Sequence, residues 1–292
     1  MPKERSTRST KPPTTPDSDE LDLYRFIEIG PDACVPHPFW IAKYPVTNGQ
    51  YERFLEAPDF AAEGYWRGFL KFDENCQQMG QWGDEGWIWL QETQKNSQLS
   101  PDGKRVLPKY WGDIKFGIAM RKNPVVGVTW FEASAYCQWL RTHWAELAES
   151  RANPGLRPRL VRLPLKTEWV IAAGGDDPQK RFPWDAPNKM TEEIKEIVHH
   201  ANVHESGIGH TMPVDTYPEG ASPHGVMDMA GNAWEWQANY DKDNDLLALR
   251  GGSWHSNEGS ARLSARPFLA HDSSAPYGAG SDLGFRVVAL PE

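Results

Sequence analysis

Residues 225–236 read Gly-Val-Met-Asp-Met-Ala-Gly-Asn-Ala-Trp-Glu-Trp, an apolar stretch interrupted by polar residues and glycine. The side chains of Asp228, Asn232 and Glu235 supply oxygen atoms beside Gly231, as in a tight loop that holds a hard cation such as Ca²⁺. The two tryptophans indicate that large rings are buried here. A metal-free turn between two core strands explains the same residues, because Asn, Asp and Gly are typical of turns. This stretch alone leaves both interpretations open.

The composition limits the class of protein. The chain has 292 residues, enough for one large domain or two small ones. Its formal net charge is −9, so the positive footprint of a nucleic-acid-binding protein is missing. No run of about 18 apolar residues predicts a membrane span, and the first residues lack the apolar segment of a secretion signal. We therefore expect a cytoplasmic protein without nucleic-acid or membrane partners.

The three cysteines are Cys34, Cys76 and Cys137. An odd number at wide spacing, without a Cys-x-x-Cys pair, argues against a disulfide framework and against a structural zinc site. Cys137 falls on the apolar face of a predicted helix and is expected to be a small buried hydrophobic residue. Cys34 and Cys76 fall in loop-like segments, where we expect free thiols.

Residues 1–20 consist mainly of Ser, Thr, Pro and charged residues. Such a segment cannot bury enough apolar surface to offset the entropy of ordering, so we predict a disordered tail. The remainder, 21–292, is expected to be a single domain. Within it, residues 57–122 are rich in Gly, Trp and charge and lack a sustained period, which indicates an insertion pinned by aromatic side chains. A carbohydrate-stacking surface is the alternative for this segment.

Two capping-box patterns predict the main helices. Thr47 and Thr129 each precede a Gln or Glu by three residues, and the helices are expected to run to about Leu55 and Glu149. A further short helix is expected over 168–173.

Residues 189–200 also have helical composition, whereas short strands are expected at 21–29, at 39–44 and repeatedly after residue 201. Helices early and strands late within one compact unit predict an α+β fold.

Several motifs occur in the same order as in a known family. The stretch at 228–236 is followed by Leu-Arg-Gly-Gly-Ser-Trp at 249–254 and by Leu-Gly-Phe-Arg-Val-Val at 283–288. Shorter matches lie upstream, at 39–48, 123–130, 162–169, 182–184, 201–202 and 211–214. Together they resemble the formylglycine-generating enzyme (sulfatase-modifying factor) family over about residues 24–290. The resemblance implies a C-type-lectin-like fold with a small twisted antiparallel sheet, two main helices and much irregular structure, but a fold does not fix an activity.

The catalytic cysteines of that family have no counterpart here. The family's oxidising enzymes bind copper through two cysteines just after the Arg-Gly-Gly-Ser-Trp motif, and residues 255–266 contain none. Because soft Cu(I) is bound by thiolates, we expect neither copper nor formylglycine generation. A related branch forms sulfoxides with non-haem iron, held in part by histidines of an additional helical domain. His255, His271 and Asp272 are the candidate ligands of a self-contained iron site; solvated loop residues are the alternative.

The resemblance also implies two structural Ca²⁺ sites, built from oxygen ligands that suit this ion. Four positions match the first site: Asp228, Gly231, Ala233 and Glu235. In the second site, the side chain of Asn202 and the carbonyls of Val203 and Ile208 are the matching ligands. The acidic ligand of the second site is not identified, because the segment that begins at Glu205 is shorter than the family's loop.

Residues 255–282 have an unusual composition. Apart from Glu258 they include no Lys, Glu, Gln, Met or Trp, and every other residue can be encoded by a codon that ends in a pyrimidine. This pattern is similar to the variable region of proteins that are diversified by retroelements, some of which use the same lectin-like scaffold.

We therefore interpret the chain as a non-enzymatic variable protein that presents 255–282 on a calcium-stabilised scaffold and binds an unknown protein or small ligand. Loops on a rigid frame tolerate substitution and concentrate binding residues. The candidate contacts are His255, Ser256, Asn257, Leu263, Phe268, Leu269, His271, Asp272 and Tyr277. Three alternatives stay open: a metal-dependent oxidoreductase of the same family using iron or copper, a structural module of a larger assembly, and an ordinary loop rich in Ala, Ser and Gly.

Overall fold

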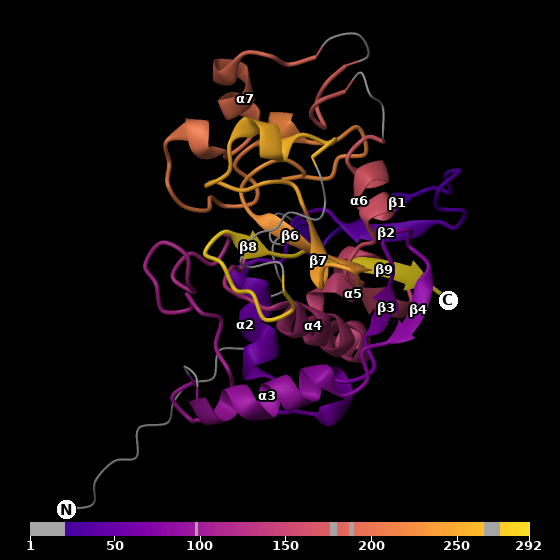
Figure 1. Ribbon diagram of the computed structural model, residues 1–292, viewed down its shortest axis with the longest axis vertical. Coiled ribbons are helices and arrows are strands. Elements are labelled where there is room, and N and C mark those ends of the chain that lie inside the picture. The colour runs from indigo at the N-terminus through magenta and orange to yellow at the C-terminus, as the bar shows by residue number, and fades with distance from the viewer. Residues whose placement is uncertain (1–20, 97–98, 176–179, 187–189, 266–274) are drawn as a thin grey trace, which may run out of the picture.

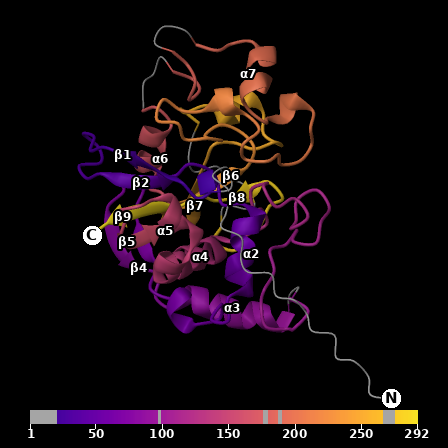
Figure 2. The ribbon, with the colours of Figure 1, turned by 180° about the vertical axis from the view of Figure 1, so that it is seen from behind.

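The computed structural model describes residues 21–96, 99–175, 180–186, 190–265 and 275–292. The predicted disordered tail, 1–20, lies outside these ranges. Within them, no helix is both long and apolar enough to cross a bilayer. Helices α2 (Asn48–Glu56) and α3 (Glu85–Asn96) lie toward one end of the molecule, and a loop-rich part that carries α7 (Ile194–His200) lies at the other (Figures 1 and 2).

The first sheet joins segments from opposite ends of the chain. Its strands are β1 (Phe26–Ile29), β2 (Phe39–Ala42), β5 (Pro158–Arg162) and β9 (Val288–Pro291). They lie in the order β1-β2-β9-β5, and all neighbours are antiparallel. The strands predicted at 21–29 and 39–44 are thus confirmed in shortened form.

The second sheet is built around β6, a strand whose first residues belong to the stretch 225–236. Its strands are β3 (Leu70–Phe72), β4 (Gln78–Gln81), β6 (Trp234–Asp241), β7 (Leu246–Arg250) and β8 (Leu283–Gly284). The order is β4-β3-β6-β7, and β8 pairs with β6 in parallel. Trp234 and Trp236 of β6 are both buried in the main aromatic core, as the sequence predicts.

Both capping boxes are confirmed. In α2 (Asn48–Glu56), the backbone N–H of Thr47 donates to Oε1 of Gln50 at 2.8 Å. In α4 (Trp130–His143), the N–H of Thr129 donates to Oε2 of Glu132 at 2.8 Å. Each pair satisfies N–H groups that a helix start would otherwise leave without an acceptor.

Helix α4 ends at His143, earlier than the predicted end at Glu149. A 3₁₀ turn, Trp144–Glu146, follows, and then the short helix α5 (Ala148–Ala152). The indole N–H of Trp144 donates to the carbonyl of Leu156 at 3.2 Å, and its ring packs on Phe26. These tertiary contacts fix the ring in the core at the point where the helix stops.

The remaining helices are α3 (Glu85–Asn96), α6 (Lys166–Ala172) and α7 (Ile194–His200). The segment 57–122 contains more regular structure than its irregular pattern predicts, since α3, β3 and β4 all lie in it. Its tryptophans do pin it to the core. Trp66 stacks on Trp89, and Trp82 packs against Trp130.

A fully buried ion pair joins the two halves of the fold. The guanidinium of Arg286 donates to both carboxylate oxygens of Glu235, at 2.6 and 2.7 Å, and both side chains are 0% exposed. Arg286 also donates to the carbonyls of Ala42 and Met227, and the indole N–H of Trp169 donates to Glu235 at 2.7 Å. One cluster of polar groups thus ties β2, β6, α6 and the segment before β9 together.

Replacing Arg286 with Met should lower the free energy of unfolding by about 3–5 kcal/mol, because Glu235 would remain as an unpaired buried charge. Urea denaturation at pH 7 measures the loss. Lys195→Ala is the control, since it breaks an exposed ion pair with Glu193 and should cost less than about 1 kcal/mol. Equal losses in the two variants would contradict the importance of the buried pair.

Candidate functional site

The segment predicted to bind ligand is described in two parts. The first, 255–265, begins against the 3₁₀ turn His204–Ser206, where the N–H of His204 donates to the carbonyl of Ser256 at 2.9 Å. His255 and Asn257 are exposed. The side chain of Asn257 accepts the N–H of Ser260 and so caps the 3₁₀ turn Glu258–Ala261.

The second part, 275–282, crosses the start of α4. The carbonyl of Pro276 accepts the N–H of Trp130 at 3.2 Å, and the carbonyl of Gly280 accepts the N–H of Gly127 at 2.9 Å. Both contacts use backbone atoms of the segment. These two anchors do not require particular side chains, whereas the buried carboxylate of Asp282 accepts the hydroxyl of Ser253 at 2.9 Å.

Trp254 lies between the two parts. Its indole N–H donates to the carbonyl of Ser281 at 3.3 Å, and its ring lies 5.6 Å from that of Phe116. In Figure 1 the first part (gold) lies with the loops around α7, and the second part (yellow) lies beside β8. The predicted recognition segment therefore contributes to two regions of the surface.

One predicted contact residue is not at the surface. Leu263 is only 4% exposed and packs in a core cluster with Ile29 and Trp169. Its carbonyl accepts Nη1 of Arg250 at 3.0 Å, so the backbone at this position is also held from inside. The prediction of Leu263 as an exposed contact is therefore wrong, because its side chain belongs to the buried core.

Four other predicted contacts, Phe268, Leu269, His271 and Asp272, lie outside the described residues. The candidate iron ligands His271 and Asp272 are among them, so the iron hypothesis is not tested by their positions. Within the described ranges, no group of three or more His, Cys, Asp or Glu side chains is placed to hold a metal ion.

Tyr277 is 60% exposed and lines a cavity of about 310 Å³. Trp89 of α3 lines the same cavity, together with Lys109, Thr129 and Glu132. The ring of Tyr277 also packs edge-on against Phe131, with the centroids 5.5 Å apart. The second part of the segment therefore forms one wall of a hollow that reaches the N-terminal end of α4.

Glu132 is the functional candidate that the sequence did not single out. It is 2% exposed, and its Oε2 accepts both the N–H and the hydroxyl of Thr129, at 2.8 and 2.9 Å. Its Oε1 is buried and has no hydrogen-bond partner among the described residues. Burial raises the pKa of Glu132 to about 7. The capping box marked this residue as a helix cap, but spacing alone could not place it beside Tyr277.

The first calcium ligand set fits a cation only in part. Both carboxylate oxygens of Glu235 are already engaged by Arg286. Asp228 is buried, its Oδ2 accepts the side-chain amide of Asn232 at 2.8 Å, and burial raises its pKa to about 7. A cation near this loop would therefore be faced mainly by Asp228 and by the carbonyls of Gly231 and Ala233.

The second ligand set fits a cation better. Oδ1 of Asn202 and Oε2 of Glu205 are buried and have no hydrogen-bond partner within the described part of the chain. The two residues belong to one turn, and Val203 lies between them. Glu205 is therefore the candidate for the acidic ligand that the sequence left unidentified. Unpaired buried oxygens of this kind suit Ca²⁺.

Asn232 links the two ligand sets. Its Oδ1 accepts the N–H of Met212 and the side-chain amide of Asn202, and its own amide donates to Met212 and Asp228. Its backbone φ is +65°, a left-handed conformation that Asn tolerates better than most residues. Asn232 thus connects the stretch 225–236 to Met212 and Asn202 by hydrogen bonds.

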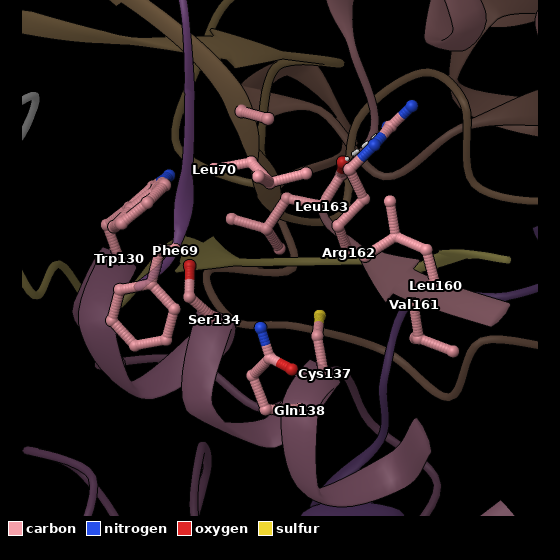
Figure 3. A pocket seen from close by; sticks show the side chains of 11 residues that line it. Phe69, Leu70, Trp130, Ser134, Cys137, Gln138, Leu160, Val161, Arg162 and Leu163 are labelled. Carbon is pink, nitrogen blue, oxygen red and sulfur yellow. Dashed lines mark hydrogen bonds between the residues drawn. The ribbon is translucent and has the colours of Figure 1, made fainter. Parts of the chain in front are cut away.

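The three cysteines differ in their exposure to solvent. Cys137 is buried, as predicted, and burial raises the pKa of its thiol. The cavity beside it measures only about 30 Å³ (Figure 3), about the space of one water molecule. Cys34 and Cys76 instead line a surface cavity of about 920 Å³ together with His37, and Asn239 donates to the sulfur of Cys76 at 3.2 Å.

Comparisons with known proteins agree with the motifs. Residues 28–290 match the family described as "Sulfatase-modifying factor enzyme 1-like domain". The "Inactive C-alpha-formylglycine-generating enzyme 2" of Bos taurus is 28% identical over 264 residues, which cover 85% of this chain and 76% of that protein. The "Hercynine oxygenase" of Mycolicibacterium smegmatis is 26% identical over 255 residues, or 78% of this chain, and the match spans 48% of that enzyme.

Among solved structures, "Treponema denticola variable protein 1" superposes with a TM-score of 0.52 at 18% identity and covers 91% of this chain and 95% of its own. At this identity the likeness shows the fold alone. It confirms the α+β, C-type-lectin-like fold class expected from the motifs.

Glu132→Gln should change the dependence of stability on pH. The pKa of Glu132 is raised from 4.5 to about 7 in the folded chain, so its contribution to stability is full below pH 4.5 and is lost as the pH rises through 7. Gln does not titrate, so the variant should gain on the wild type between pH 5 and 8, by up to about 3 kcal/mol. Urea denaturation at both pH values measures this gain, and a constant difference would contradict the shifted pKa.

Proposed function

Because the chain belongs to the sulfatase-modifying factor family, we propose that it is a non-catalytic variable protein of the type diversified by retroelements. In this proposal residues 255–282 form a surface that binds a protein or a small ligand. Its recognition residues among those described are His255, Ser256, Asn257 and Tyr277.

The observation that carries the proposal is the way the segment is held. Part of the contact with the rest of the fold is made by the carbonyls of Ser256, Pro276 and Gly280, whereas the side chains of His255 and Tyr277 are exposed. Backbone anchors survive substitution of neighbouring side chains, so the surface can change without loss of the fold. The named inactivity of the bovine relative is in line with a binding role.

The proposal includes calcium as a structural ion. The second ligand set supports it most directly, because Asn202 and Glu205 each present a buried oxygen that lacks a partner among the described residues. A bound Ca²⁺ would neutralise Glu205 and join the turn at 202–206 to the frame. The same turn contacts Ser256, so the ion would stabilise the base of the binding surface.

A metal-dependent oxidoreductase is the second candidate. The similarity to hercynine oxygenase favours it. Such an enzyme would hold its metal through ligands other than cysteine, as the missing cysteine pair requires. The oxidoreductase hypothesis requires a redox metal in the purified protein, whereas the binding proposal requires no redox metal.

Sequences of this chain from independent isolates should differ mainly within codons 255–282. The expected changes fall at exposed positions such as His255 and Tyr277. Leu263, which packs in the core, and Asp282, whose Oδ2 accepts the hydroxyl of Ser253, should stay constant. A near-copy of the segment with adenines at the varied codons, beside a reverse transcriptase gene, would be the decisive observation. Variation spread evenly over the chain would refute the proposal.

Metal analysis of the purified protein after dialysis should find Ca²⁺ and only traces of iron or copper. Glu205→Gln should lower the retained Ca²⁺, because the substitution removes the charged ligand from the second set. Glu146→Gln, which changes an exposed acid away from both sets, is the matched control. Stoichiometric iron or copper together with oxygen consumption would favour the oxidoreductase instead.

A further inference from the structure

Three helices of this chain begin with the same local device. A Gln or Glu at the third helical position accepts a backbone N–H from the residue before the helix, in α2, α4 and α6. In α2 the remaining amide group of Gln50 donates to the carbonyl of Leu23 at 2.9 Å. In α6 both oxygens of Glu168 accept from Arg162, at 2.6 and 2.7 Å. In both caps, the oxygen and nitrogen atoms at the end of the Gln50 or Glu168 side chain therefore have hydrogen-bond partners.

The cap of α4 differs from the other two. Glu132 carries a formal negative charge when ionised, is buried, and has an Oε1 without a partner among the described residues. A buried carboxylate oxygen without a donor or cation is costly and calls for an explanation. Glu132 is also one of the residues that line the cavity of about 310 Å³ beside Tyr277.

The other walls of this cavity suit a positive group. Trp89 and Tyr277 both line it, and aromatic faces attract ammonium and guanidinium groups. Burial raises the pKa of Tyr277, and the carboxylates of Glu85, Asp245 and Glu92 raise it further. Three carboxylates are thus close enough to act on Tyr277. Lys109 also lines the cavity, but its Nζ lies 5.5 Å from the ring centroid of Tyr110.

An ordered water molecule is the simpler occupant. The hydroxyl of Tyr51 is also buried without a partner among the described residues. Burial raises its pKa most and the nearby Glu132 raises it further, so the two groups are near each other. A water between them would satisfy both. Such a water would leave the aromatic walls and the acidic surroundings of Tyr277 without a role, and it would not select a cation over a neutral molecule.

We infer that the cavity beside Tyr277 receives an organic cation, an alkylammonium or alkylguanidinium group, with Glu132 as its counter-ion and Trp89 and Tyr277 as its walls. The inference rests on the proposed function, because it makes residues 275–282 part of the recognition surface and names the chemistry of the ligand. The cation can belong to a free amine or to a Lys or Arg side chain of a partner protein; both present the same group to Glu132.

The test is a titration of the full chain with butylamine and butylguanidine at pH 8, followed by calorimetry and by tryptophan fluorescence. Butanol and butyrate are the neutral and anionic controls. We expect saturable binding of the two cations and none of the controls. Glu132→Gln should weaken binding at least about tenfold, because it removes a charged acceptor. The cap should survive, since α2 uses Gln at the same position.

Glu146→Gln is the matched variant for net charge. Glu146 is exposed and lies outside the cavity lining, so this variant should bind both cations as the wild type does. Tyr277→Ala should weaken binding, and Tyr277→Phe should restore most of it, because the ring face is what contacts the cation. Equal binding of butylamine and butanol, or undiminished binding by Glu132→Gln, would overturn the inference in favour of a water-filled cavity.

A blocked Gly-Lys-Gly peptide and its Nε-acetylated form separate the two sources of the cation. Binding of the peptide and of butylamine alike supports a free amine as sufficient ligand, whereas much tighter binding of the peptide supports a side chain of a partner. The acetylated peptide should not bind in either case. Failure of all cations to bind, with natural variation still confined to 255–282, would remove this inference and leave the proposed function in place.

Discussion

The pair of buried charges at Glu235 and Arg286 is the constraint on which the rest of the frame depends. Glu235 stands on β6 in the middle of the second sheet, and Arg286 stands just before β9 in the first. Each charge would be costly in the interior without the other, so the pair favours the arrangement in which β6 and the segment before β9 meet. Trp169 adds a hydrogen bond from α6 to the same carboxylate. The stretch 225–236 therefore contributes to the fold in two ways: through its turn and through the charge of Glu235.

Local patterns predicted the elements that local interactions determine. The capping boxes at Thr47 and Thr129 placed the starts of two helices correctly, because a capping box is complete within four residues. The end of α4 was misplaced, because it depends on the contact of Trp144 with Leu156, which no helical pattern contains. Helix α3 was missed for a related reason. It carries aromatic residues on more than one face, which hides its period.

The candidate site shows the same limit more clearly. The composition of 255–282 marked the segment, and exposure of His255 and Tyr277 agrees with a surface role. The burial of Leu263 was not predictable, because it follows from packing against Trp169, a residue far away in sequence. The position of Glu132 beside Tyr277 likewise arises only when 275–282 crosses α4. The residue types predicted which chemical groups are available, but only the fold determines which of these groups lie close together.

The position of β9 has a consequence for biosynthesis. This strand lies between β2 and β5, so it supplies the hydrogen-bonding partner of both. On the ribosome, β2 and β5 emerge long before residues 288–291 and have no common neighbour in the meantime. The first sheet therefore cannot close until translation has passed β9, and contacts of such long sequence separation form slowly. Completion of the first sheet is therefore a late event in the folding of this chain.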